Sequence, residues 1–316
     1  MIAINLAEPV NKLVFAVEAL VVVTIIANIA VTFSNALVRY LTNQDFSWAS
    51  DVWAILISII TFLGAPAYFR RGAGMAYTAL IDRSHGLRRQ TLQACGLVIF
   101  LGVCVVALAA YPAFFAGQLT QTLQVIGISS GFVAIWLGLG LLLFCLFAIE
   151  KLLRLDRRAI MIGVAAGAAM ALATVALRRA YDLEVIDIDP FLLIVPGLVI
   201  AFITGVPIAG VLALAGLLYF VITGEAPITT VPSAMQYGVS SFILLAVPFF
   251  MVAGTLMEVT GIARRMIDMV QEWVGHWTCG LLVAQVVAMY VFSGLSGSKA
   301  ADIATVGGVM KTPLRA

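Results

Sequence analysis

The residues best suited to chemistry stand together near the carboxyl end of the chain, directly after a long apolar run. Ser296, Gly297 and Ser298 form the tip of a predicted re-entrant hairpin of two helices at membrane depth, where lipid tolerates no unpaired backbone. Hydroxyls and freed carbonyls are oxygen ligands of the kind that hard cations prefer, which predicts a sodium ion near Ser296 and Ser298. The N–H groups that open the second helix carry partial positive charge and attract a carboxylate. The tip is therefore predicted to hold a cation and an organic anion side by side.

Three further residues support this predicted site. Asp302 lies in the first turn of the second helix, Lys299 precedes it by three residues on the same face, and Ser293 comes before the tip. Ionisable side chains at membrane depth are costly and commonly functional. One alternative is that Lys299 and Asp302 form a structural pair that closes the hairpin. The alternative for the tip is a plain kink packed against neighbouring helices.

The rest of the sequence offers little chemistry. It contains no nucleophile with a paired base, no zinc-ligand spacing and no glycine-rich phosphate loop, so we expect neither an enzyme nor a cofactor beyond the sodium ion. Basic residues fall in short loops, which gives no indication of nucleic-acid binding. Asp51, before the second apolar run, is expected to cap a helix or to contact a partner. The cysteines are expected to be small core hydrophobes, since all four lie inside apolar runs.

The composition predicts an all-α protein that crosses the lipid bilayer several times. Of the 316 residues, 63% are hydrophobic and 11% are charged, whereas soluble domains average about 25% charged residues. Four apolar runs long enough to span a bilayer form a first unit, at residues 19–38, 52–69, 91–115 and 131–149. The loops after the second and fourth runs are rich in arginine and the loop after the third is uncharged, so both ends of this unit should be cytoplasmic.

The order of the remaining elements leaves one conflict open. A fifth apolar run, 159–177, leads into an acidic linker that ends at residue 189, and two interrupted runs follow at 191–223 and 241–257. Residues 261–277 have the pattern of an amphipathic helix lying at the membrane surface. If the fifth run and both later runs each cross once, Arg264 and Arg265 end outside, against the positive-inside rule. Either the fifth run lies in the interface, or an interrupted run re-enters, or the arginine pair breaks the rule.

Several motifs resemble the membrane subunits of TRAP transporters, the tripartite ATP-independent periplasmic carriers. Three stretches of this chain resemble the large subunit. They are Gly205-Val-Pro-Ile-Ala209, Leu244-Leu-Ala-Val-Pro-Phe-Phe-Met-Val-Ala-Gly-Thr-Leu-Met257 with Gly261-Ile-Ala-Arg-Arg265, and Gly294-Leu-Ser-Gly-Ser-Lys-Ala-Ala-Asp302. Three earlier stretches resemble the small four-helix subunit more loosely: Phe46-Ser-Trp-Ala-Ser-Asp51, Phe62-Leu-Gly64 and Arg70-Arg-Gly72. Asp51 stands where that family more often has glutamate, and the histidine usual after the Arg-Arg-Gly element is missing.

This resemblance implies a fused membrane component with three parts. Residues 1–158 would be the small-subunit-like domain, 159–189 a linker helix with its acidic linker, and 190–316 the first part of a large elevator-type permease with an amphipathic arm. The implied activity is sodium-coupled import of an organic acid, usually a carboxylate, which a periplasmic solute-binding protein delivers to the bacterial inner membrane. Ser296, Gly297 and Ser298 would line the sodium and substrate region, with Asp302 supporting it.

The sequence also raises an alternative to transport. Transporters of this kind place the site between two inverted repeats, and this sequence reaches Ala316 just past the first predicted hairpin. We therefore expect an incomplete site whose missing second half would be a partner. The alternative function is a non-transporting scaffold or assembly fragment.

Overall fold

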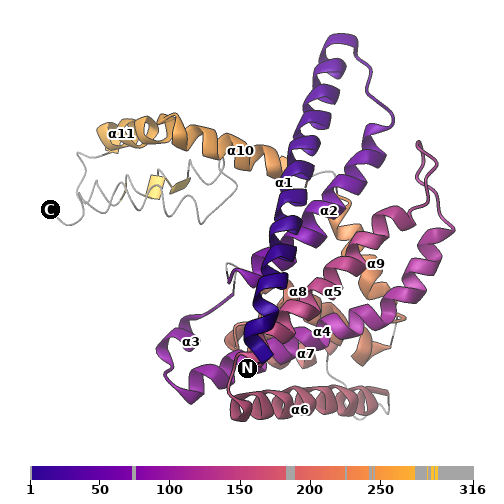
Figure 1. Ribbon diagram of the computed structural model, residues 1–316, viewed down its shortest axis with the longest axis vertical. Helices are drawn as coiled ribbons and strands as arrows, with labels where there is room; N and C mark the ends of the chain where they lie inside the picture. Colours follow the sequence, from indigo (N-terminus) through magenta and orange to yellow (C-terminus); the bar gives the residue numbers. More distant parts are fainter. Residues whose placement is uncertain are drawn as a thin grey trace. The chain divides into compact units, whose positions relative to one another are not determined.

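The computed structural model describes residues 2–72, 76–182, 189–224, 226–241, 244, 246–274, 283, 286–287 and 289–290. The chain divides into two compact units, Met1–Ser240 and Ser241–Ala316, which are described separately here (Figure 1). The predicted linker 159–189 lies inside the first unit. The division into three parts concerns family origin and stays a prediction.

Long helices occupy all four apolar runs of the predicted small-subunit-like domain. They are α1 (Ile2–Thr42), α2 (Ala49–Arg70), α4 (Leu87–Leu119) and α5 (Gly131–Leu153), with the short α3 (Ala79–Arg83) between α2 and α4. Together with α6 (Arg157–Asp182), these four long helices are apolar and long enough to cross a bilayer. The prediction of an all-α membrane protein is confirmed.

The fifth apolar run is α6, and it lies beside α4 (Figure 1). The backbone N–H of Asp156 donates to Oε1 of Gln90 at 3.2 Å, near the start of both helices. Further along, a Cβ added to Gly163 would come within 2.9 Å of Ala94. Small residues allow this close approach between helices in lipid. Because α6 begins beside the start of α4 and follows it in the same direction, the spanning interpretation of the fifth run is favoured.

The interrupted run 191–223 is two helices rather than one. Asp189 begins α7 (Pro190–Ile203) by accepting a hydrogen bond at Oδ1 from the N–H of Phe191 at 2.9 Å. The helix ends at a turn in which Gly205 has a φ of +79°, a conformation that glycine adopts without strain. The chain then returns as α8 (Ile208–Thr223), which packs against α7 and against α6.

This helical hairpin removes the topological conflict of the sequence. The end of α8 lies near the end of α6, since a Cβ on Gly224 would be 3.6 Å from the Arg178 guanidinium. The chain thus re-emerges at the end where α7 began, which is one of the three alternatives left open. If α10 then crosses once, Arg264 and Arg265 are cytoplasmic, as the positive-inside rule requires.

One buried core joins the four-helix part to the helices that follow. It contains Phe100 and Phe147 from α4 and α5 together with Leu214 and Ile222 from α8, all at most 6% exposed. The short α9 (Thr230–Val239) contacts α2, α4, α5 and α8. Residues up to Ser240 are therefore packed as one body.

The second unit contains α10 (Ala246–Val259) and α11 (Ile262–Val274), which contact each other. The predicted helix 261–277 is confirmed as a helix over Ile262–Val274. Asp268 and Glu272 are exposed on this helix; of its apolar residues Val270 is buried, whereas Ile262, Met269 and Trp273 are exposed. A position at the membrane surface stays a prediction.

Candidate functional site

The predicted hairpin site lies outside the residues that the structure describes. Its sodium and substrate assignments stay predictions. These are Ser293, Ser296, Gly297, Ser298, Lys299 and Asp302.

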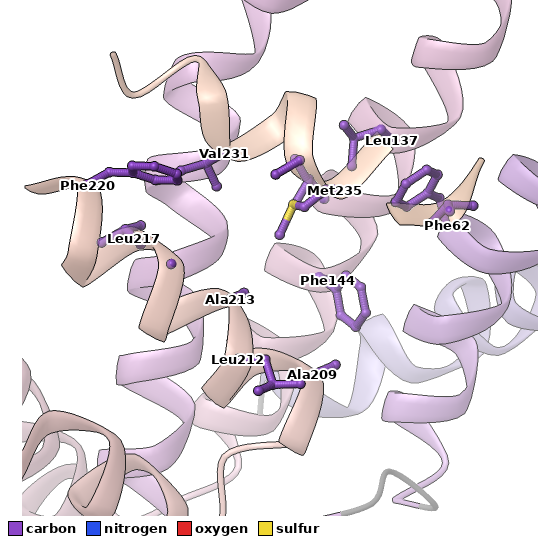
Figure 2. A pocket seen from close by; sticks show the side chains of 15 residues that line it. Phe62, Leu137, Phe144, Ala209, Leu212, Ala213, Leu217, Phe220, Val231 and Met235 are labelled. Atoms are coloured by element: carbon purple, nitrogen blue, oxygen red, sulfur yellow. The ribbon is translucent and has the colours of Figure 1, made fainter. Parts of the chain in front are cut away.

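The site that the structure does describe is the joint between the four-helix part and α8 and α9. An apolar cavity of about 380 Å³ lies there, with walls from α2, α5, α8 and α9. Figure 2 shows Phe62 and Phe144 on one side and Leu212, Leu217 and Met235 on the helices opposite. Nearly every wall is hydrocarbon or aromatic, so the joint is held by packing and is unsuited to binding an ion.

One polar contact crosses this apolar joint. Nε2 of Gln236 on α9 donates to Oγ of Ser58 on α2 at 3.2 Å, and both side chains are buried. Ser58 in turn donates to the backbone carbonyl of Ala54 at 2.7 Å. Neither residue stands out in the sequence. The only signal was a polar side chain within an apolar segment, and the partner was 178 residues away.

A charged network ties the helices together at the inner end, the end with the basic loops. Arg70 on α2 donates to both carboxylate oxygens of Glu150 on α5, from Nε at 2.8 Å and from Nη2 at 3.1 Å. Both side chains are about 15% exposed. Arg154 adds a second guanidinium at 2.6 Å, and Arg71 pairs with Glu18 on α1. Two-pronged contacts of this kind fix helix orientation as well as adding energy.

The Arg-Arg-Gly motif therefore acts as a junction of three helices. Nη2 of Arg70 also donates to Oδ1 of Asn11 on α1 at 2.8 Å. Glu150 was missed in the sequence analysis, although it is the first charge after a run without any from residue 90 to 149. That isolation was the available signal, since a lone carboxylate beside membrane depth needs a partner.

Asp51 makes the corresponding contact at the outer end. It is 6% exposed, and its Oδ2 accepts hydrogen bonds from the N–H groups of Val125 and Ile126, each at 2.9 Å. Both donors lie in the loop between α4 and α5. Of the two expected roles, Asp51 does not cap its own helix with its side chain. It fixes this loop, and a contact with a partner protein stays a prediction.

The turn between α7 and α8 is pressed against α4. A Cβ added to Gly96 would lie 2.4 Å from the carbonyl oxygen of Thr204, so only glycine allows this approach. Pro207 in the same turn forms a bridge with Ala76, which follows α2. The first helices of the large-subunit-like segment are thus seated on the inner end of the four-helix part.

The described residues contain no group of three or more His, Cys, Asp or Glu side chains placed to hold a metal ion. Cys104 is buried in the core, as expected of a small hydrophobe, and Cys95 and Cys145 are partly buried. All three are free thiols.

Comparison with protein families divides the chain at α6. Residues 28–158 match the family described as tripartite ATP-independent periplasmic transporters, DctQ component. Residues 195–314 match the tripartite ATP-independent periplasmic transporter, DctM component. Most of α6 lies in the stretch between the two matches.

Individual relatives match over about a third of the chain. It is 39% identical over 119 residues to the C4-dicarboxylate TRAP transporter large permease protein DctM of Rhodobacter capsulatus, covering 37% of this chain and 27% of that protein. It is 39% identical over 110 residues to the sialic acid TRAP transporter permease protein SiaT of Haemophilus influenzae, covering 35% and 18%. It is 33% identical over 120 residues to the isethionate TRAP transporter permease protein DctMQ of Oleidesulfovibrio alaskensis, covering 38% and 19%. In each case the match spans less than a third of the relative's own length.

Proposed function

Since the chain belongs to the TRAP transporter family and joins segments of its small and large membrane components, we propose that it serves sodium-coupled import of an organic acid. Components of this family are multi-pass proteins of the bacterial inner membrane, in agreement with the five candidate spans. A periplasmic solute-binding protein delivers the acid in this proposal. Relatives named for C4-dicarboxylate, sialic acid and isethionate transport support a carboxylate or sulfonate as the substrate.

The observation that carries the proposal is the shared core of the two family segments. Phe147 on α5 and Ile222 on α8 belong to one buried cluster, and both are at most 1% exposed. Fixed packing of this kind suits a scaffold that holds still while a separate part moves the substrate. In the proposal, α1 to α9 are that scaffold, and the hairpin at 293–302 belongs to the part that binds substrate.

A reconstituted uptake assay tests the proposal. Proteoliposomes that contain the chain together with the second half of the large permease, with a periplasmic binding protein outside, are offered labelled C4-dicarboxylate, sialic acid or isethionate with and without an inward sodium gradient. We expect uptake of one acid that requires sodium. The variants Ser298→Ala and Asp302→Asn should reduce the sodium dependence, because each removes an oxygen ligand or a charge at the predicted tip.

The matched control is Ser233→Ala, which removes an exposed hydroxyl that donates only to Thr229 on the same helix. It should leave uptake unchanged. Uptake with unaltered sodium dependence in both tip variants would remove the hairpin from the proposal. If the folded chain transports none of the acids, the scaffold alternative takes its place, and co-purification with a separately encoded second half would support that alternative.

A further inference from the structure

A second cavity, of about 410 Å³, lies at the inner end of the first unit, where the α7–α8 turn meets α2, α4 and α5. Its size falls within the range of about 300–1,000 Å³ that is typical of ligand pockets. It is separate from the apolar cavity of Figure 2, and no step of the proposed transport uses it.

The charged residues of this cavity are mainly basic. Arg89, Lys151 and Arg154 line it, against one carboxylate, Asp82. Asp82 already accepts a hydrogen bond from the hydroxyl of Thr78 at 2.8 Å.

The cations differ in how far their charge is compensated. Arg154 is paired with Glu150. Lys151 donates to the carbonyl of Phe69 and lies 4.1 Å from the centroid of its ring, neither of which neutralises its charge. Arg89 has no ion-pair partner within the described part of the chain. Arg89 therefore faces the cavity without a carboxylate of its own, and Lys151 has beside it only Glu150, which already pairs with Arg70 and Arg154.

One wall of the cavity is apolar, and it adjoins Lys151, whose ammonium group lies over the Phe69 ring. Phe69, Leu97 and Phe100 contribute side chains from α2 and α4, and the two phenylalanine rings lie 5.0 Å apart. A free inorganic anion would gain nothing from these rings. A molecule with an anionic head and an apolar stem would contact both walls at once.

We propose that this cavity binds the phosphate headgroup of an anionic phospholipid of the inner leaflet, with Arg89 and Lys151 contacting the phosphate. Basic pockets between membrane helices on the cytoplasmic side favour such headgroups, because the leaflet there carries negative charge. Guanidinium and ammonium groups are the usual donors to phosphate oxygens. The glycerol and first methylene groups of the lipid pack on Phe69 and Leu97. The bound lipid thus fills the space between the α7–α8 turn and the four-helix part.

The test measures lipid binding by native mass spectrometry of the purified full chain. The chain is titrated in detergent with phosphatidylglycerol and with phosphatidylcholine of the same acyl chains. We expect phosphatidylglycerol to bind more tightly. Arg89→Gln should weaken that binding about fivefold, the usual worth of one basic residue near an anionic membrane surface. Arg89 is exposed and bonded to no other described residue, so this variant should fold normally.

The matched control is Arg88→Gln, the same change one residue earlier, at an exposed position that does not line the cavity. It should bind phosphatidylglycerol as the unaltered chain does. Equal binding of the two lipids, or equal losses in the two variants, would overturn the proposal. A third arm adds inorganic phosphate alone. If phosphate raises the unfolding temperature through Arg89 while phosphatidylglycerol does not bind preferentially, the ligand is a free anion and the lipid assignment is wrong. The assay does not depend on transport.

Discussion

Two carboxylates at opposite ends of the four-helix part, one buried and one partly buried, are held by different kinds of partner. At the outer end, Asp51 accepts from the backbone N–H groups of Val125 and Ile126. At the inner end, Glu150 accepts from the guanidinium groups of Arg70 and Arg154.

The difference follows from the charge asymmetry of the loops. The segment from residue 120 to 130 contains no charged side chain, so only its backbone can donate to Asp51. The inner loops are rich in arginine, as the positive-inside rule requires. The charge asymmetry that orients the protein in the membrane therefore also decides which donors are present at each end. At the outer end, backbone donors bind Asp51 and hold a loop in place, whereas at the inner end side-chain ion pairs join helices.

The largest effect is expected from removing the ion pair between Glu150 and Arg70 at the inner end. Glu150→Gln keeps the shape of the side chain but leaves Arg70, about 15% exposed, without its carboxylate. Weakening the two hydrogen bonds from Arg70 to a charged carboxylate should lower the free energy of unfolding by about 3 kcal/mol. Unfolding in mixed detergent micelles, followed by tryptophan fluorescence, measures the loss. The control Arg154→Gln removes only the pair whose arginine is 58% exposed, and should cost less than about 1 kcal/mol. Equal losses of stability in the two variants would mean that the pair with Arg70 stabilises the fold no more than the exposed pair with Arg154.

A smaller effect is expected from removing the hydrogen bonds that Asp51 accepts at the outer end. Asp51→Ala leaves two N–H groups of the α4–α5 loop without their acceptor, which should cost about 2 kcal/mol. Asp51→Asn retains one oxygen acceptor and should cost about half as much. Asp45→Ala, at an exposed aspartate in the preceding loop, is the matched control and should have no effect. Faster hydrogen exchange at Val125 and Ile126 in the alanine variant would locate the loss in the loop, and unchanged exchange would contradict the comparison.

The smallest effect is expected at the apolar joint, from the hydrogen bond between Gln236 and Ser58. Ser58→Ala removes the acceptor of Gln236, and such hydrogen bonds between membrane helices contribute about 0.6 kcal/mol on average. Gln236→Leu combined with Ser58→Ala should be closer to neutral than Ser58→Ala alone, because no buried donor is then left unpaired. A double variant that loses more than the single one would show that packing of Gln236 outweighs its hydrogen bond.

Much of the fold could be predicted from the sequence, because apolar length is a strong signal in membranes. The runs that became α2 and α5 were placed to within a few residues. The break inside 191–223 was harder to place. Three residues interrupt this run in the sequence: Gly205 and Pro207 form the turn, whereas Pro196 lies inside α7. A proline in a membrane helix is tolerated when neighbouring groups satisfy the freed carbonyl, so composition alone does not decide which residue ends a helix.

The polar contacts within the four-helix part could not be predicted in the same way. Arg70 and Glu150 are 80 residues apart, and Asp51 and Val125 are 74 apart. Nothing in local propensity pairs such residues, because their meeting depends on which helices become neighbours. The sequence indicated that Asp51 needs a partner but offered two kinds. The hairpin site at Ser296 to Asp302 lies outside the described residues and stays a prediction.

The course of α6 has a consequence for how such a protein is made. The preceding four helices begin and end at the inner face, whereas α7 begins at the end of the molecule that α6 reaches. For the two segments to be made as one chain, an odd number of crossings must lie between them, and a spanning α6 would supply a single one. It also lies in the stretch between the two family matches. A spanning α6, which packs on α4 through Gly163, would thus let segments of the two components that start on different sides of the membrane be synthesised as one chain.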